Sequence, residues 1–213
     1  MTETAQTNLI PRSLFVFAVL YGGMTCIAGI LGAKQVAIGP LAVESGIFPF
    51  LLLVVLSSSV AELHGRDVAN RLARFGFLPL ITAIVLIQLV LALPTDPGMY
   101  EPAKEAFPII LSQGARLMFA GIIAYGVSQF LNVYIFSRLT SMKGALLALR
   151  AAIASALSQI VDTVIFITIA FYGERPIGQL LLGQGSAKVV LSFLLVPFLI
   201  IFFVKLGRRL DRG

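Results

Sequence analysis

Long apolar runs alternate with short polar segments along the chain, and six of these runs are long enough to cross a membrane. A spanning helix needs about 17–25 predominantly apolar residues. The runs cover approximately residues 13–32, 47–64, 77–93, 114–136, 146–172 and 187–205. Most of the gaps contain Gly and Pro, which favour turns. The pattern predicts an all-α integral membrane protein in which residues 1–213 form a single transmembrane domain, one bundle of six helices.

The composition agrees with a membrane setting. Hydrophobic residues make up 58% of the chain, charged residues only 12%, and the mean hydropathy is +0.97. A soluble domain carries about 25% charged residues, so this chain has too little polar surface to cover itself in water. The single Cys (Cys26) excludes an intramolecular disulfide, and the single His (His64) leaves little for metal binding or catalysis. We therefore expect no metal site, no cofactor, no catalytic residue and no enzyme activity.

Basic residues are distributed unequally between the two ends of the spans. Cytoplasmic loops carry the excess of Lys and Arg in membrane proteins. An even number of spans then places both termini in the cytoplasm. The net charge of +6 follows from this topology and does not indicate nucleic-acid binding, because the basic residues flank spans and do not form one face. Ten residues flank one end, namely Arg12, Arg66, Arg71, Arg74, Arg138, Lys143, Lys205, Arg208, Arg209 and Arg212, and three flank the other, namely Lys34, Lys104 and Arg175.

Two of the apolar runs contain the same nine-residue pattern, at residues 128–136 and 158–166. Each copy has Ser-Gln, two apolar residues, an Asn or Asp, two further residues and Ile-Phe. The polar and aromatic members share one helix face, because they are three and seven residues apart. They are Gln129, Asn132 and Phe136 in the first copy and Gln159, Asp162 and Phe166 in the second. Unpaired polar groups cost several kcal/mol in hydrocarbon, so two such stripes predict a polar cavity.

Five ionisable residues lie at or within the spans, and each would be costly if it faced lipid. They are Glu62, Arg116, Arg150, Asp162 and Lys188. The two arginines lie near span starts and can instead extend to the lipid headgroups. Glu62 can pair with Arg66 one turn further on. Lys188 shares a helix face with Ser192, and each ionisable residue is a candidate for a pocket or an ion pair.

Asp162 is too deep in its span to reach the membrane surface. It lies about 16 residues into the fifth run, or some 24 Å along a helix. The polar stripes can serve as interhelical hydrogen bonds, typically worth under ~2 kcal/mol per contact. A carboxylate with aromatic neighbours favours a binding site over this purely structural role.

The two copies of the pattern are expected to be staggered, because the fourth and fifth runs are antiparallel. Asn132 lies about four to six residues from the cytoplasmic end of its span, whereas Asp162 lies beyond the midplane. The expected level partner of Asn132 is Arg150 or Ala151. The stripes would then form a ladder along one cavity.

Small residues at four-residue steps mark one face of the first span. Ala18, Gly22 and Cys26 allow another helix to approach closely. Packing within the chain is favoured over docking of a partner.

Several short motifs, taken together with their order and spacing, resemble those of the queuosine precursor transporter family, also described as vitamin uptake transporters. The resemblance extends from about residue 20 to residue 205. The phrase with Asp162-Thr163 is the most specific. The phrases are Gly32-Ala33-Lys34-Gln35-Val36, Phe48-Pro49-Phe50, Ala61-Glu62-Leu63-His64-Gly65, Ser128-Gln129 with Asn132 and Ile135-Phe136, Arg150 with Ser158-Gln159, Asp162-Thr163 and Phe166, Ile169-Ala170-Phe171, and Lys188 with Pro197.

The resemblance implies a single-component importer in the bacterial inner membrane, with six helices similar to the binding component of energy-coupling-factor transporters. It implies a deazapurine substrate, such as cyano-deazaguanine or aminomethyl-deazaguanine, on the route to the tRNA base queuosine. No energising module is expected, and the remaining contacts are with membrane lipid. The implied binding residues are Glu62, Gln129, Asn132, Arg150, Gln159, Asp162 and Lys188, and Phe166 is expected to stack on the ring. A guanine-like edge has two adjacent N–H donors, which one carboxylate can accept together.

The chain departs from the family pattern at several polar positions. Gly29 and Ala33 stand where the first helix often has Asn, Ser58 where the second has Asp, and Asn132 where the fourth has Asp. Glu62 and Asp162 are then the carboxylates left inside the membrane. Proton coupling that needs the missing acids is disfavoured.

Other functions remain open. The main alternative is a substrate-binding subunit for another vitamin or nucleobase that needs a separate ATPase module. A membrane enzyme needs a nucleophile with a base, or a metal set, and neither His64 nor Cys26 supplies one. A structural assembly factor would not need two polar stripes.

Overall fold

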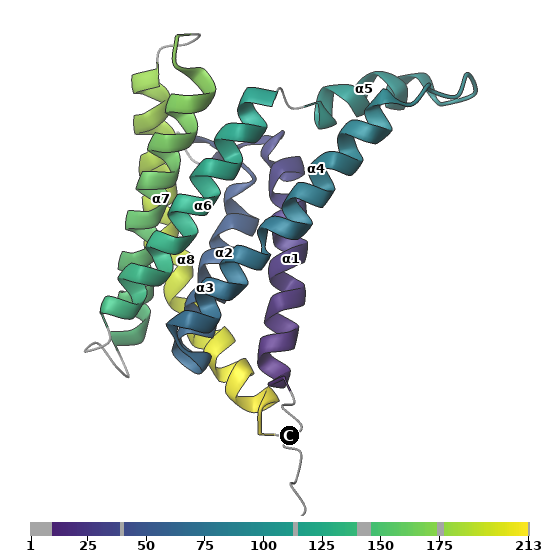
Figure 1. Cartoon of the computed structure of the whole chain (residues 1–213). Helices are drawn as coiled ribbons and strands as arrows, with labels where there is room; N and C mark the ends of the chain where they lie inside the picture. The colour runs from purple at the N-terminus through teal and green to yellow at the C-terminus, as the bar shows by residue number, and fades with distance from the viewer. Residues whose placement is uncertain (1–9, 39–40, 113–114, 140–145, 174–176, 213) are drawn as a thin grey trace, which may run out of the picture.

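The fold is described from a computed structural model, for residues 10–38, 41–112, 115–139, 146–173 and 177–212 (Figure 1). Eight helices and one two-stranded hairpin make up this part of the chain. In order they are α1 (Arg12–Gly32), β1 (Gln35–Ile38), β2 (Leu41–Glu44), α2 (Ile47–His64), α3 (Arg66–Phe75), α4 (Phe77–Ala92), α5 (Glu101–Leu111), α6 (Ala115–Arg138), α7 (Leu147–Phe171) and α8 (Ile177–Leu210).

Six helical segments among the described residues are long and apolar enough to span a membrane. Five of them are single helices, and the third combines α3 and α4 over Arg66–Ala92. Helix α8 begins at Ile177, ten residues before the expected start of the sixth span at 187. Its first turns contain Gly178, Gly183 and Gly185. Packing partners allow glycines in membrane helices, so this glycine-rich segment continues the helix and does not form a loop.

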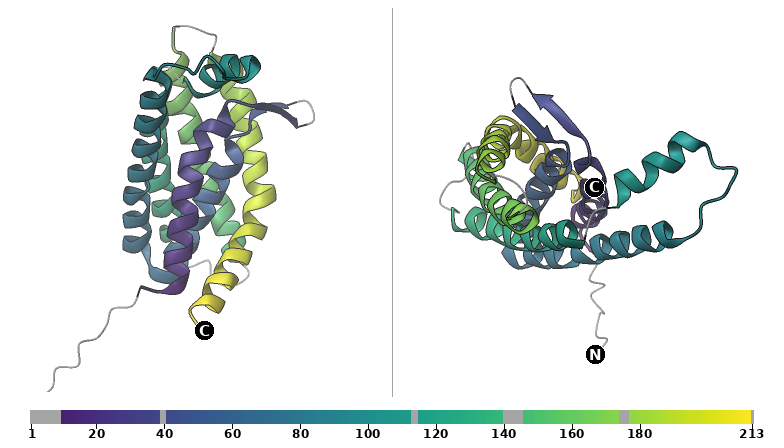
Figure 2. Two further views of the ribbon diagram at one scale, coloured as in Figure 1. Left: turned by 90° about the vertical axis from the view of Figure 1, so that its right-hand side faces the viewer. Right: turned by 90° about the horizontal axis from the view of Figure 1, so that it is seen from above.

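The bundle is arranged around α2, whose central residues are almost completely buried. Helices α1, α3, α6, α7 and α8 all contact it. Helix α7 packs most extensively against its two antiparallel neighbours, α6 and α8. The first residue of α1 and the last residue of α8 lie at the same end of the bundle (Figures 1 and 2).

A β-hairpin follows α1 and is the one exception to the expected all-α architecture within the described residues. Its strands are antiparallel, with Gln35 opposite Glu44 and Val36 opposite Val43. Ser45 attaches the end of β2 to the end of α1. Its amide donates to the carbonyl of Lys34 at 2.8 Å, and its hydroxyl donates to the carbonyl oxygens of Leu31 and Lys34. The hairpin, whose last residue is Glu44, therefore lies at the end of the bundle opposite the start of α1 and the end of α8 (Figure 2).

Helices α4 and α5 diverge from the bundle and form an arm (Figures 1 and 2). No residue of either helix is buried. The side chains of α4 are nearly all apolar, which suits contact with lipid. Helix α5 was not expected from the sequence, because its apolar residues alternate with Glu101, Lys104 and Glu105. It lies across the end of the molecule at a steep angle to the spans (Figure 1).

Three helix ends meet at the terminal end of the bundle. The Ser13 hydroxyl lies 2.7 Å from both His64 Nε2 and Asp211 Oδ2, and the Ser13 amide donates to Asp211 Oδ1 at 2.9 Å. Burial raises the pKa of Asp211, but the two hydrogen bonds from Ser13 and the adjacent His64 outweigh it and hold the pKa below its usual value. The contribution of these bonds to stability is therefore present above the ordinary carboxyl pKa. It is lost as the pH falls through the lowered value.

Gly46 provides a test of the hairpin attachment. A Cβ atom there would lie 2.8 Å from the backbone oxygen of Ala28 and 3.2 Å from Cα of Gly32. Because backbone atoms cannot turn aside, Gly46→Ala should destabilise the protein by about 1–3 kcal/mol. Thermal unfolding of the purified protein measures this loss. Gly32→Ala is the control, since a Cβ there has no neighbour within 4 Å. Equal melting temperatures for both variants would contradict the packing described.

Candidate functional site

A cavity of about 230 Å³ lies between the helices at the hairpin end of the bundle. Residues from β2 and from α1, α2, α4, α5, α6, α7 and α8 line it, and most of them are apolar. The polar exceptions include Glu44, Tyr125, Asp162 and Lys188. Ligand pockets are typically apolar clefts with a few placed polar groups and volumes of about 300–1,000 Å³. At about 230 Å³ this cavity is somewhat smaller than that range, which suits a small heterocycle.

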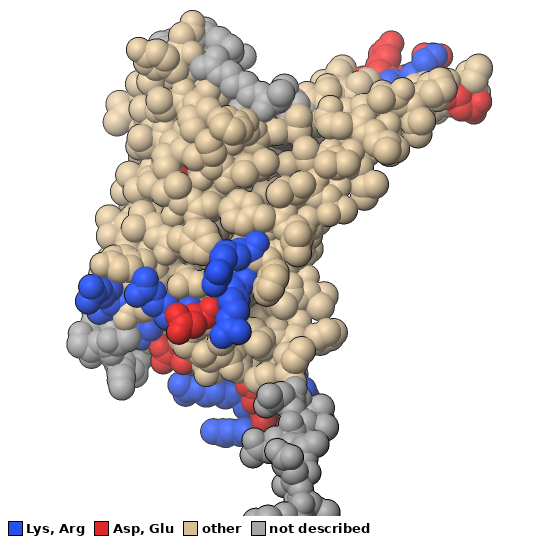
Figure 3. Space-filling model, viewed as in Figure 1, with Lys and Arg blue, Asp and Glu red and all other residues tan. Residues whose placement is uncertain are grey.

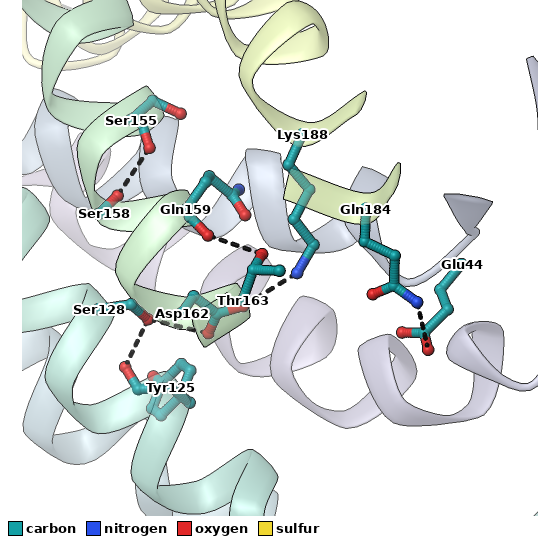
Figure 4. A network of polar contacts seen from close by, with 10 residues as sticks. All are labelled: Glu44, Tyr125, Ser128, Ser155, Ser158, Gln159, Asp162, Thr163, Gln184 and Lys188. Atoms are coloured by element: carbon teal, nitrogen blue, oxygen red, sulfur yellow. Dashed lines mark hydrogen bonds and ion pairs between the residues drawn. The ribbon is translucent and has the colours of Figure 1, made fainter. Parts of the chain in front are cut away.

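Asp162 and Lys188 form a buried ion pair in the cavity wall (Figure 4). Lys188 Nζ donates to Asp162 Oδ2 at 3.1 Å, and the Ser128 hydroxyl donates to Asp162 Oδ1 at 3.2 Å. Asp162 is 6% exposed and Lys188 9% exposed. A carboxylate can accept about four hydrogen bonds, so Asp162 retains acceptor capacity for a ligand. Phe166, one turn beyond Asp162, also lines the cavity.

The two copies of the repeated pattern are staggered, as expected, but the stagger is about one helical turn and not about three. The hydrogen bond between Ser128 on α6 and Asp162 on α7 brings the start of the first copy level with the middle of the second. In an antiparallel pair this register puts Asn132 close to the level of Ser158, not of Arg150 or Ala151. Counting from the predicted span ends had assumed that both helices begin at one depth. The side-chain contacts show that α6 and α7 are offset along their axes by more than one helical turn relative to this assumption.

Gln129 and Asn132 do not line the cavity but belong to a buried network with α1 and α2. Gln129 Oε1 accepts from the Tyr21 hydroxyl at 3.2 Å and from Ser57 at 3.5 Å. Tyr125 donates to Tyr21 at 3.0 Å. Because Tyr125 also lines the cavity, the tyrosine pair connects the cavity to this network. The Gln129 Nε2 and Asn132 Oδ1 atoms have no partner in the part of the chain described.

Asn132 on α6 and Ser58 on α2 contact each other. Asn132 Nδ2 donates to Ser58 Oγ at 3.0 Å, to Ser57 Oγ at 3.1 Å and to the carbonyl oxygen of Val54 at 3.3 Å. An Asp at position 132 has no donor for the Val54 oxygen. The amide at 132 and the hydroxyl at 58 therefore form a matched pair.

This contact predicts that an acid at position 132 is harmful in this chain. Asn132→Asp should lower the free energy of unfolding by about 1–3 kcal/mol, because a buried carbonyl loses its donor. Denaturation in detergent, monitored by helical circular dichroism, measures the change. Asn132→Gln is the control that keeps the amide chemistry but alters the side-chain length. If Asn132→Asp is as stable as the native chain, the contact is not needed.

Gln159 is fully buried on α7, one turn before Asp162, and neither atom of its amide has a partner among the described residues. The adjacent Thr163 hydroxyl donates to its backbone oxygen at 2.8 Å (Figure 4). An unmade buried hydrogen bond costs about 1–3 kcal/mol. Bound water or ligand would satisfy this amide.

Glu62 and Arg150 lie at the terminal end, away from the cavity lining. Arg150 Nη1 lies 2.9 Å from Glu62 Oε2, so Glu62 pairs with Arg150 on another helix, and the alternative pairing with Arg66 is not found among the described residues. Arg150 does not extend to headgroups but is 3% exposed. Its Nε donates to the Phe136 carbonyl at 2.6 Å, and its guanidinium lies 3.6 Å from the centre of the Phe136 ring. The Arg116 side chain lies outside the described residues.

The eight candidate residues therefore occupy three places. Asp162, Lys188 and Phe166 line the cavity; Gln129, Asn132 and Gln159 are buried beside it; Glu62 and Arg150 pair at the opposite end. Sequence reasoning missed Glu44. Tyr125, which also lines the cavity, continues the stripe of Gln129 one turn earlier, but it was not among the candidate binding residues. Glu44 precedes the second span in a segment without helical periodicity, and nothing in the pattern indicated a strand there.

The face of the first span that carries small residues packs within the chain, as expected. A Cβ on Gly22 would lie 3.7 Å from the Pro79 ring, and Cys26 Sγ lies 3.5 Å from the Pro79 carbonyl oxygen. Gly29, further along α1, lines the cavity.

Comparison with known proteins identifies the relatives of this chain. Residues 44–202 match the model of a family described as "Putative vitamin uptake transporter". The chain is 27% identical over 185 residues to a Bacillus subtilis (strain 168) protein named "Probable queuosine precursor transporter", covering 84% of this chain and 80% of that protein. No solved structure matches it.

Proposed function

Because the chain belongs to the vitamin uptake transporter family, a family of multi-pass proteins of the bacterial plasma membrane, we propose that it imports a deazapurine precursor of queuosine. The observation that carries this proposal is the Asp162–Lys188 pair in the wall of a small, mostly apolar cavity. The name of the Bacillus subtilis relative supports the choice of substrate. Cyano-deazaguanine and aminomethyl-deazaguanine are the two candidates.

The cavity chemistry suits a guanine-like ring. Asp162 accepts two adjacent N–H groups of the ring edge, in place of one bond from Lys188. Lys188 then donates to an acceptor on the ring. Phe166 and Tyr125 offer aromatic faces beside the same wall, and stacked rings add about 0.5–1.5 kcal/mol beyond burial. The apolar remainder of the cavity excludes water and strengthens these polar contacts.

We place both termini in the cytoplasm. Arg and Lys side chains gather around the end of the molecule at which the termini lie (Figure 3). The positive-inside rule assigns that end to the cytoplasm. The cavity and hairpin then lie toward the periplasmic side, where an imported substrate arrives.

Rescue of cells tests the proposal. Bacteria that cannot make the precursor but retain the later enzymes are fed cyano-deazaguanine or aminomethyl-deazaguanine while expressing this chain. Queuosine should appear in their tRNA with the native chain and be absent with Asp162→Ala. No rescue by the native chain, at an expression level confirmed by immunoblot, would overturn the proposed function. Equal rescue by both would remove Asp162 from the binding site.

A further inference from the structure

The cavity contains more negative than positive charge. Two carboxylates, Glu44 and Asp162, and one ammonium, Lys188, line it, which leaves a net charge of −1. Lys188 pairs with Asp162 at 3.1 Å. Among the described residues no Lys or Arg is paired with Glu44, although Lys34 lies close by in sequence at the start of the hairpin. The carboxylate of Glu44 is thus the uncompensated charge of the cavity.

Gln184 adds a buried acceptor beside Glu44. Its Nε2 donates to Glu44 Oε1 at 3.3 Å, whereas its Oε1 has no partner among the residues described. Gln184 is 8% exposed, so water does not readily compensate for this oxygen. Figure 4 shows Oε1 turned toward the side on which Lys188 and Asp162 lie. A carboxylate and an unpartnered amide oxygen together favour a donor that carries positive charge.

The two polar groups of residues at the cavity are spaced for one small molecule. Glu44 lines the cavity, and Gln184 lies behind it as its hydrogen-bond partner. Gln184 and Lys188 are four residues apart on α8, a rise of about 6 Å along the helix. Asp162 lies beside Lys188, and Glu44 lies beside Gln184 (Figure 4). A bicyclic ring whose polar edge contacts Asp162 would direct a substituent toward Glu44.

We propose that Glu44 and Gln184 form a specificity subsite for a primary ammonium group on the substrate. This rests on the proposed function, in which Asp162 binds the ring edge. An ammonium has three donors and can bond both oxygens, and charge-assisted bonds are about twice as strong as neutral ones. A nitrile presents only an acceptor to the same two oxygens. The chain therefore prefers aminomethyl-deazaguanine to cyano-deazaguanine.

Calorimetric titration of the purified, detergent-solubilised chain with each compound tests the subsite. The native chain should bind aminomethyl-deazaguanine at least about 10-fold more tightly than cyano-deazaguanine. Glu44→Gln should weaken binding of the amine about 10-fold and leave binding of the nitrile within about 2-fold. Gln184→Leu, which keeps the charge of Glu44 but removes the free oxygen, should weaken only the amine, by a smaller factor.

Glu101→Gln is the matched control. It removes one carboxylate from α5, at the same end of the molecule but outside the cavity lining, where Glu101 is 68% exposed. Native selectivity is expected in this variant, because general attraction of a cation to the surface is not the cause. Equal affinity of the native chain for both compounds, or equal weakening of both by Glu44→Gln, would overturn the subsite and leave the proposed function intact. Absence of binding by either compound would overturn both.

Discussion

Replacing Asp162 by Asn should reduce deazapurine binding about 100-fold and stop uptake. Asn offers one neutral acceptor in place of two charged oxygens, so one charge-assisted hydrogen bond to the ring edge, worth about 1.5–3 kcal/mol, is lost and the other weakens. A change of 1.4 kcal/mol corresponds to a factor of ten. Asp162→Asn also leaves Lys188 without its counter-ion in a buried setting. Breaking a buried pair by removing one partner costs about 3–5 kcal/mol of stability. Titration calorimetry and thermal unfolding measure the two losses separately.

A double variant separates binding from stability. Asp162→Asn combined with Lys188→Met removes both charges and replaces them with groups of similar volume. Replacing both partners of a buried ion pair is often neutral or stabilising. The double variant should therefore recover much of the lost melting temperature without recovering ligand affinity. A double variant that binds the native ligand with native affinity would show that this pair is structural.

Replacing Glu62 by Gln should destabilise the protein by about 3 kcal/mol and leave ligand affinity within about 2-fold. The guanidinium of Arg150 is buried, and Glu62 Oε2 at 2.9 Å is its counter-ion. The remaining contacts of Arg150, with the Phe136 carbonyl and ring, do not neutralise its charge. Neither Glu62 nor Arg150 lines the cavity. The melting temperature and the dissociation constant, measured on one preparation, decide whether Glu62 has a structural role or a role in substrate binding.

Two further variants sharpen this second prediction. Glu62→Gln with Arg150→Met removes the buried charge and should restore stability. Arg150→Lys should not substitute for Arg, because an ammonium cannot both bond two acceptors in the plane of the guanidinium and lie flat on the Phe136 ring. A Glu62→Gln protein that melts normally but fails to bind would instead place Glu62 in contact with the substrate.

The spans could be predicted from the sequence because crossing a membrane imposes a length and an apolar composition on each helix. The same criterion could not predict the hairpin or α5, which lie outside the apolar runs. It also misplaced the start of α8, where glycines resembled a loop. Helix ends are the least constrained part of such a pattern, since several residues near each end satisfy the same hydrophobic requirement.

The candidate site was only partly predictable. The cost of an unpaired charge in hydrocarbon identified Asp162 and Lys188 separately, but it could not pair them, because they lie on different helices. The same argument identified Arg150 and Glu62 without revealing that they share an ion pair far from the cavity. Glu44 was missed because a carboxylate outside the spans carries no such cost. Pairing depends on the register between helices, which the sequence did not determine correctly. The hydrogen bond from Ser128 to Asp162 reveals the register of α6 and α7.

Transport by liposomes that contain only this chain tests the central claim most directly. Purified protein is reconstituted without any other component, and entry of labelled aminomethyl-deazaguanine is measured for the native chain and for Asp162→Asn with Lys188→Met. We predict entry with the native chain, competition by excess unlabelled compound, and background entry with the double variant. Binding of the compound without entry would contradict the claim and would indicate a subunit that needs a separate ATPase module.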